Sequence, residues 1–347
     1  MIETLSLCNT CYKKIPAFIY AKDGEAWMKK ECDVHGKMEA MVEKSWKHWS
    51  NFYQYGTVGN NNSIIVHIND TCNMKCKWCY YPSGVEKIHD QQFFDQLLHE
   101  PYKGFSLMFS GGEPTLRNDY IDFVKGASAR GWNPSTITNM ISLAEDAFFA
   151  KTLNEAFIAN DNTYRFAMSF QHPKNYDNKI RKAKEATLSN IEAAGIKAAC
   201  MMFSIETLDE LDFIKDFYDA TRHLYGMLRI RTMFHNWRNK GEKKLFLSEL
   251  HDAFLDKFSE YTPVQFSGIE RSTGYGMYLR TKECRDISLM SAPTVENVDY
   301  HLCSRPVYML ARDYRCYPVP LAQIVNQGFS EGWHSGFKIT EVDKCSQ

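Results

Sequence analysis

The segment Cys72-Asn73-Met74-Lys75-Cys76-Lys77-Trp78-Cys79 places three cysteines at C-x3-C-x2-C spacing. Three thiolates from one tight loop can bind three irons of a cubane [4Fe–4S] cluster, which leaves the fourth iron without a protein ligand. An open coordination site is what a substrate or cofactor needs in order to reach a metal. The spacing therefore favours a catalytic cluster over a closed electron-transfer cluster. A structural zinc loop is the alternative for the same triplet.

The residues around this segment alternate between strand-like and helix-like stretches. Strands are expected at 63–68, 104–110, 134–138, 164–170, 196–205 and 226–233. Helices are expected at 91–100, 118–130, 143–160, 178–194, 207–220 and 244–260. Six β–α alternations predict a parallel sheet with right-handed crossovers, and six units curl more naturally into an open, partial (β/α)6 barrel than into a closed eightfold one. Chemistry in such sheets lies at the carboxyl ends of the strands.

A second motif, SGGEP at residues 110–114, ends the second expected strand. Gly111 and Gly112 would let the backbone approach a ligand without a Cβ clash. Glu113 can accept hydrogen bonds from an ammonium group. By itself the motif could equally be an ordinary strand-to-helix turn. Together with the cysteine triad, its position after the next strand favours a binding site.

The two motifs together resemble the radical S-adenosylmethionine superfamily in spacing, in the aromatic Trp78 before the last cysteine, and in position after the first strand. The resemblance implies that the methionyl amine and carboxylate of S-adenosylmethionine chelate the open iron, with the Glu113 segment holding the amine. It also implies a flavodoxin or ferredoxin-type electron donor, reductive cleavage of the C5′–S bond, and hydrogen abstraction from an unactivated carbon by the 5′-deoxyadenosyl radical.

The same resemblance suggests further cofactor contacts near the triad and at later strand ends. For each of them a turn residue or a solvated side chain is an equal alternative. The candidates are Trp78, Tyr80, Asn139, Ser169, Gln171 and, on the helix that follows, Arg181.

The first 60 residues carry a different cysteine pattern. Cys8, Cys11, Cys32 and His35 form C-x2-C…C-x2-H, a good tetrahedral site for zinc or a rubredoxin-like iron. Four protein ligands leave no open position, so the role is expected to be structural. The stretch between the two pairs shows hairpin-like alternation around KDGE at 22–25. This knuckle, followed by the radical core, resembles the group that contains pterin methyltransferases and tetraether-lipid synthases.

Residues 263–347 are expected to form an irregular extension with a hairpin at 308–319, beyond an N-terminal knuckle and linker (1–60) and the barrel (61–262). Four thiolates in this extension could hold an auxiliary [4Fe–4S] cluster with no free site. Free thiols are the alternative. Cys200, in the middle of a strand, is expected to be core packing. The four extension cysteines are Cys284, Cys303, Cys316 and Cys345.

The charge balance, the absence of evident targeting segments and the cysteine content bear on the class of function. The 347 residues carry 41 Lys and Arg against 42 Asp and Glu, which gives no global electrostatic reason to expect nucleic-acid binding. No signal peptide and no membrane-spanning stretch is evident. Eleven cysteines without a leader point to metal ligation in a reducing cytoplasm rather than to disulfides.

Three hypotheses of function remain open at this point. The first is a radical enzyme that acts on a small molecule or lipid, by C–C bond formation or methyl-type transfer, which the N-terminal knuckle favours. The second is a radical enzyme that modifies a peptide or protein, which an auxiliary cluster would favour. The third is a non-catalytic iron–sulfur binding module, which would not bind S-adenosylmethionine.

Overall fold

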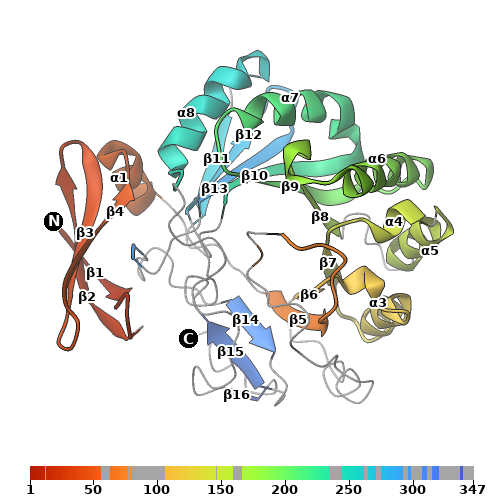
Figure 1. The fold of residues 1–347 in the computed structure, drawn as a ribbon, viewed down its shortest axis with the longest axis horizontal. Coiled ribbons are helices and arrows are strands. Elements are labelled where there is room, and N and C mark those ends of the chain that lie inside the picture. The colour runs from red at the N-terminus through yellow and green to blue at the C-terminus, as the bar shows by residue number, and fades with distance from the viewer. Residues whose placement is uncertain are drawn as a thin grey trace.

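The structure is a computed structural model of the chain. Within the described residues, the strands form a four-stranded sheet and a twelve-stranded sheet (Figure 1). No helix among the described residues combines the length and the apolar character needed to cross a bilayer. The described residues are 1–11, 13–55, 63–76, 79, 106–145, 147–158, 166–233, 244–261, 265–270, 275–291, 296–297, 307–310, 315–319 and 337–338.

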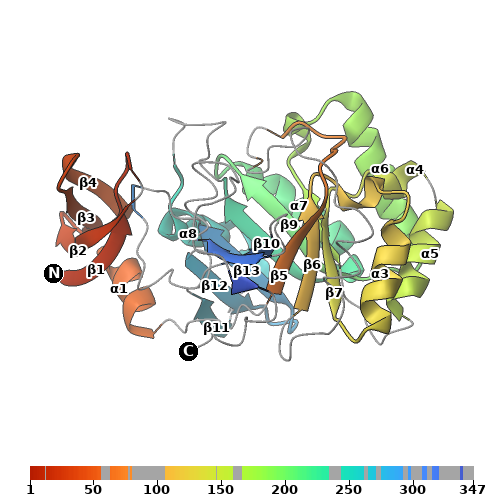
Figure 2. The ribbon, with the colours of Figure 1, turned by 90° about the horizontal axis from the view of Figure 1, so that it is seen from below.

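The four-stranded sheet is an antiparallel meander at one end of the molecule (Figures 1 and 2). Asp23 and Gly24 form the two-residue turn between its second and third strands, with φ of 51° and 82°. Positive φ at both positions is what a tight hairpin turn requires, so the expected hairpin is confirmed. Helix α1 (Trp46–Tyr55) follows the sheet. The strands are β1 (Ile2–Leu7), β2 (Lys14–Lys22), β3 (Glu25–Cys32) and β4 (Gly36–Glu43).

The centre of the large sheet consists of six parallel strands, adjacent to one another in chain order. Each begins and ends within two residues of an expected strand, so these strand predictions are confirmed. Curvature of the sheet into a partial (β/α)6 barrel stays a prediction. The strands are β5 (Ser63–Asn69), β6 (Ser106–Gly111), β7 (Pro134–Thr138), β8 (Phe166–Phe170), β9 (Ala198–Ile205) and β10 (Tyr225–Thr232).

Helices run along the outer side of these strands (Figure 1). Alternate strand residues such as Phe203, Leu228 and Ile230 are buried in the apolar core that the helices cover. The Asp177 side chain caps α6 by accepting from the Ile180 amide at 2.8 Å. The helix expected at 91–100 lies outside the described residues. The helices are α3 (Tyr120–Ala129), α4 (Ser142–Glu145), α5 (Ala147–Ile158), α6 (Asn178–Ala193), α7 (Glu210–Thr221) and α8 (Leu247–Lys257), with 3-10 turns η1 (Pro114–Leu116), η2 (Pro173–Asn175), η3 (Arg222–Leu224) and η4 (Ser259–Tyr261).

The residues after 263 are more regular than expected, because they extend the large sheet at both edges. At one edge β13 pairs in parallel with β10, and at the other β14 pairs in parallel with β5. Ile287, Ser288 and Leu289 are all fully buried in β13, so this strand is covered on both faces, as strands of parallel sheets commonly are. The expected hairpin at 308–319 is confirmed. The added strands are β11 (Gln265–Glu270), β12 (Tyr275–Arg280), β13 (Asp286–Ser291), β14 (Val307–Leu310), β15 (Arg315–Val319) and β16 (Phe337–Lys338).

Candidate functional site

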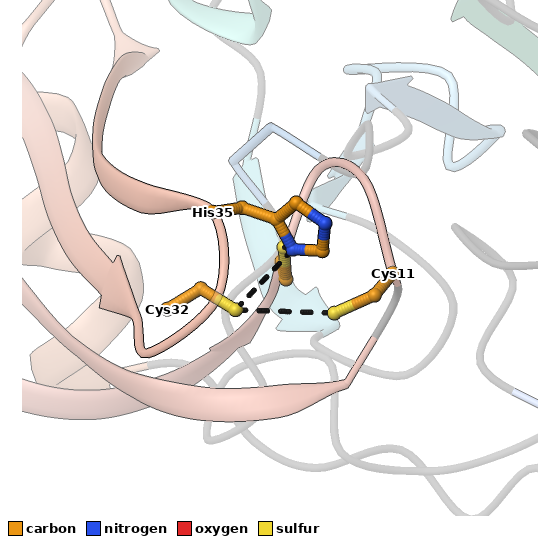
Figure 3. A group of neighbouring side chains, drawn as sticks. Cys11, Cys32 and His35 are labelled. Atoms are coloured by element: carbon orange, nitrogen blue, oxygen red, sulfur yellow. Dashed lines mark hydrogen bonds between the residues drawn. The ribbon is translucent and has the colours of Figure 1, made fainter.

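The ligand atoms of Cys8, Cys11, Cys32 and His35 all lie within 4.8 Å of one another. His35 Nδ1 is 3.4 Å from Cys8 Sγ. It is also 3.5 Å from Cys32 Sγ, and the sulfurs of Cys11 and Cys32 are 3.9 Å apart (Figure 3). A tetrahedral zinc ion spaces sulfur and nitrogen ligands about 3.3–3.8 Å apart. The four expected ligands therefore fit a single ion between the turns that end β1 and β3.

The backbone around these thiols favours the thiolate form, which is the form that binds metal. Burial alone would raise the pKa of Cys8, but hydrogen bonds from the backbone amides of Cys11 and Thr10 outweigh it and lower the pKa to about 6. Hydrogen bonds from the backbone amides of Val34 and His35 lower the pKa of Cys32. The backbone amides of the two turns thus favour deprotonation of Cys8 and Cys32, which metal binding requires.

The cysteine triad follows directly on β5, and its three side chains are half-buried. The Cys79 amide donates to the carbonyl oxygen of Cys76 at 3.2 Å, which closes a turn between the last two cysteines. Among the described residues, two groups of possible metal ligands bring all their ligand atoms within 4.8 Å of one another, and the triad is not one of them. A cubane distributes its thiolates over separate irons and needs wider spacing than a single ion. Ligation of a cluster by this donor set stays a prediction.

Gly111 and Gly112 bring the end of β6 against the turn that leads to the triad. A Cβ on Gly111 would lie 2.4 Å from the carbonyl oxygen of Asn69, and one on Gly112 would lie 2.4 Å from that of Thr71. The amides of Gly112 and Glu113 donate to these same two carbonyls, at 2.6 and 2.8 Å. Glycine is thus required here because the end of β6 packs closely against the backbone of residues 69–71. Contact of these glycines with a cofactor stays a prediction.

Glu113 lies at the centre of a buried hydrogen-bond network and is 1% exposed. Its Oε1 accepts from the amide and hydroxyl of Thr115, at 3.1 and 2.6 Å, and from the Thr138 hydroxyl at 2.7 Å. Its Oε2 accepts from the Asn139 amide at 2.6 Å. The carboxylate therefore joins the end of β6 to the end of β7. Its expected role as acceptor for the methionyl ammonium stays a prediction.

Asn139 connects this network to the triad. Its Nδ2 donates to Asn73 Oδ1 at 2.7 Å and lies 3.7 Å from Cys72 Sγ. Burial raises the pKa of the Cys72 thiol, and the negative charges of Glu113 and Cys79 add to the rise. An amide donor beside this sulfur offsets part of the unfavourable charge. Asn139 thus links Glu113 to the turn that carries the triad, and cofactor binding by Asn139 stays a prediction.

Lys184 on α6 is a site residue that the sequence did not reveal. It is 1% exposed, and its Nζ donates to the carbonyl oxygens of Ser169, at 2.7 Å, and Asn139. Burial lowers its pKa to about 8, against the opposing attraction of Glu113, Cys76 and Cys72. The sequence did contain a sign of its burial. Lys184, Thr187 and Ile191 are spaced three and four residues apart, as residues on the buried face of one helix are.

The other expected contacts come from the end of β8 and from α6, and the side-chain hydrogen bonds described for them are to residues outside the triad. Arg181 is exposed, and its Nη2 donates to Asn178 Oδ1 at 3.0 Å. Gln171 is buried, donates to Ser169 Oγ at 3.3 Å, and accepts from the Ser204 amide at 3.1 Å. Binding of S-adenosylmethionine by these three side chains stays a prediction.

Two arginines on β10 form a second feature that the sequence did not reveal. Arg229 and Arg231 alternate with the buried Leu228 and Ile230, so both side chains lie on the face opposite the apolar core. Arg231 Nε donates to Ser204 Oγ at 2.7 Å. Arg229 Nε is buried, and no described residue hydrogen-bonds it. This face can accept an anionic group.

Two expected cofactor contacts, Trp78 and Tyr80, and two expected auxiliary-cluster ligands, Cys303 and Cys345, lie outside the described residues. Cys316 lies in β15, where only the backbone is described. Cys284 is exposed in the turn between β12 and β13. The auxiliary cluster stays a prediction. Cys200 is 4% exposed in β9, which confirms its place in the core.

Comparison with known proteins gives these sites a context. Residues 2–44 match the family model described as the HMPTM N-terminal zinc ribbon domain. A 7,8-dihydro-6-hydroxymethylpterin dimethyltransferase of Methanocaldococcus jannaschii is 28% identical over 187 residues, which cover 44% of this chain and 37% of that protein. A PqqA peptide cyclase of Bradyrhizobium diazoefficiens is 31% identical over 97 residues, which cover 26% of this chain and 25% of that protein.

The overall fold also has a solved counterpart. The structure of Streptococcus suis SuiB bound to S-adenosylmethionine superposes with a TM-score of 0.53 at 10% identity, and covers 85% of this chain and 67% of SuiB. The two curated relatives are matched over well under two thirds of their own lengths. The ligand geometry and these likenesses lead to one conclusion: residues 2–44 form a zinc ribbon, and the proteins to which the chain is similar in sequence are radical S-adenosylmethionine enzymes.

Proposed function

We propose that this chain is a radical enzyme that reductively cleaves S-adenosylmethionine and abstracts hydrogen from an unactivated carbon of its substrate. Cys72, Cys76 and Cys79 would hold a [4Fe–4S] cluster, which when bound supplies the electron for that cleavage. The observation that carries the proposal is the connection of the triad, through Asn139, to the buried Glu113 network. We place the enzyme in a reducing cytoplasm, with a flavodoxin or ferredoxin as donor.

Four of the chain's own residues would position the cofactor. Asn139 fixes the triad turn through Asn73 and Cys72. Glu113 Oε2 has one described donor, the Asn139 amide, and so retains capacity to accept from the methionyl ammonium. Lys184 supplies a buried positive charge near the triad, and Arg181 is the further candidate for the methionyl carboxylate.

We assign three regions to the chain. Residues 1–60 comprise the zinc ribbon and a linker, and residues 61–262 the radical S-adenosylmethionine region, whose six parallel strands support a partial (β/α)6 barrel. Residues 263–347 form a C-terminal extension that adds strands to both edges of the same sheet. The auxiliary cluster would lie in this extension.

A small molecule or lipid is the first candidate substrate, with C–C bond formation or methyl-type transfer as the outcome. The ribbon and the similarity to a pterin dimethyltransferase support it. Arg229 and Arg231 would bind an anionic group of that substrate on the polar face of β10. The similarity to a peptide cyclase supports the alternative, a peptide or protein substrate. A neighbouring gene for a short Cys- or Gly-rich precursor peptide would favour that alternative.

The test is anaerobic reconstitution of the full chain with iron and sulfide, followed by dithionite and S-adenosylmethionine. We expect release of 5′-deoxyadenosine, and its loss in Cys76→Ala. Cys200→Ala is the matched control, because Cys200 is buried in β9, which three strands separate from β5 in the sheet order, and its removal should leave the product unchanged. A reconstituted cluster with no spectroscopic response to S-adenosylmethionine and no product would instead identify a non-catalytic iron–sulfur module.

A further inference from the structure

Helix α1, which follows the ribbon, lies beside α8 of the large sheet's helical layer, and polar contacts join the two regions. Glu43 at the end of β4 is buried, and accepts from the Leu247 amide at 3.1 Å and the Ser248 hydroxyl at 2.6 Å. Lys44 and Glu249 form an ion pair at 2.5 Å. These contacts fix the first turn of α8 against the chain segment that leads into α1.

One turn further along this contact, three potential metal ligands from the two helices meet. His48 Nε2 on α1 lies 3.2 Å from His251 Nδ1 on α8, and the rings meet edge-on at 4.9 Å between centroids. His251 Nδ1 is also 3.2 Å from Asp252 Oδ1. The three ligand atoms all lie within 4.8 Å of one another.

The spacing of these atoms matches coordination by one ion. Zinc–nitrogen bonds of about 2.0–2.1 Å in a tetrahedral site separate two ligand nitrogens by about 3.3 Å. Hydrogen bonding alone pairs these three atoms less completely. His251 Nδ1 carries at most one proton, and it can donate that proton mainly to either His48 Nε2 or Asp252 Oδ1. A cation between the three atoms would satisfy all of their lone pairs together. Imidazole and carboxylate are common zinc ligands.

We propose that His48, His251 and Asp252 bind a divalent cation of the zinc class, which joins α1 to α8. This ion would be separate from the one in the ribbon, and water would complete its coordination. The Asp252 side chain is 77% exposed and that of His251 is 18% exposed, so an ion can enter from solvent. The site would clamp the ribbon region to the large sheet.

The test is a zinc count on the full chain with its cluster reconstituted, after equilibrium dialysis against zinc at micromolar concentration. We expect His48→Gln and Asp252→Asn each to hold about one zinc fewer per chain than the wild type. His223→Gln is the matched control, because His223 is exposed and its Nε2 pairs with Glu192 at 3.0 Å, away from α1. It should keep the wild-type count.

A second readout separates the new site from the ribbon. In a variant that combines Cys8→Ser, Cys11→Ser and Cys32→Ser, the difference spectrum on adding cobalt should show ligand-field absorption without sulfur-to-metal charge transfer, because no thiolate coordinates at the helix site. Equal zinc counts in the wild type, His48→Gln and Asp252→Asn would overturn the proposal. Asp252→Asn keeps this outcome informative even if His48→Gln folds poorly, since Asp252 is exposed. None of these counts depends on cleavage of S-adenosylmethionine.

Discussion

The side-chain amide of Asn139 lies 3.7 Å from Sγ of Cys72, and the backbone amide of the same residue donates to Glu113 Oε2 at 2.6 Å. One residue at the end of β7 therefore connects the triad to the buried carboxylate. Met140, which follows it, is buried with φ of 72°, a conformation that non-glycine residues rarely adopt. Such local strain persists only where surrounding contacts fix the backbone. Here those contacts include the Thr187 hydroxyl, which donates to the Met140 carbonyl at 2.9 Å.

Asn139→Ala should lower the reduction potential of the cluster while leaving its iron content unchanged. Hydrogen bonds to cluster sulfurs stabilise the more negative, reduced state. Loss of one such bond, worth about 0.5–1.5 kcal/mol, corresponds to a fall of about 20–60 mV for a one-electron couple. The measurement is a redox titration followed by electron paramagnetic resonance. Asn154→Ala is the control, since Asn154 Nδ2 donates to the Ala194 carbonyl on the helical side. An unchanged potential at full iron content would contradict this role.

Lys184→Met should weaken binding of S-adenosylmethionine to the reconstituted protein by about tenfold or more, the effect of losing one charge-assisted hydrogen bond. Methionine keeps the length and apolar contacts of the side chain but removes the positive charge and the donor to the Asn139 and Ser169 carbonyls. The measurement is the Kd of the cofactor under anaerobic conditions. Lys182→Met, at an exposed position of the same helix, should bind as the wild type does. Equal affinities for both variants would exclude Lys184 from the site.

The same lysine predicts a pH dependence of stability. Burial lowers its pKa to about 8 from the ordinary 10.5, so between these pH values the unfolded chain holds a proton that the folded chain lacks. The free energy of unfolding therefore rises with pH across this window, by at most about 1.4 kcal/mol per unit from this group. The free energy of unfolding, measured with urea at pH 8 and 9.5, should rise less in Lys184→Met than in the wild type. Lys30, whose pKa burial lowers to about 8, contributes equally to both proteins. Identical rises would show that Lys184 keeps an ordinary pKa.

The features that the sequence predicted correctly have local causes. The six parallel strands are short runs of apolar and β-branched residues between amphipathic helices, and the alternation itself implies parallel pairing. Asp23-Gly24 specifies its turn by backbone preference alone. Cys8, Cys11, Cys32 and His35 follow zinc-ligand spacing, and the structure brings their ligand atoms together.

The features that the sequence left hidden depend on tertiary contact. Lys184 follows several charged residues that suggest a solvated face, and only the position of α6 against the strand ends buries it. Nothing in β13 or β14 specifies that one pairs with β10 and the other with β5. His48 and His251 are 203 positions apart, so no spacing rule could have joined them.

Gly112→Ala should disrupt the triad. Its Cβ would lie 2.4 Å from the Thr71 carbonyl oxygen and 2.9 Å from the carbonyl carbon of Asp70, so the turn before Cys72 must move. We expect loss of bound iron and a fall in stability of about 2–4 kcal/mol, in the range of overpacked sites. Gly195→Ala is the contrasting control, because its φ of 67° is strained but nothing lies within 4 Å of the new Cβ. It should cost about 1–2 kcal/mol and keep the iron. Full iron retention in Gly112→Ala would contradict the close packing of β6 against the triad turn.

Removal of the ribbon metal should unfold β1–β4 locally and leave the parallel sheet folded. The four ligands lie in the two turns at one end of the small sheet, and structural zinc contributes about 10–16 kcal/mol of apparent binding free energy in small domains. Hydrogen exchange after chelation, or in Cys11→Ser, should show lost protection in β2 and β3, while β8 and β9 stay protected. Cys284→Ser is the control, because Cys284 is exposed in the turn after β12, and it should exchange as the wild type does. Apolar residues of the ribbon, Trp49 of α1 and the buried residues of the large sheet all belong to one hydrophobic core. Retained protection in β2 and β3 without metal would therefore mean that this packing, rather than the ion, holds the ribbon together.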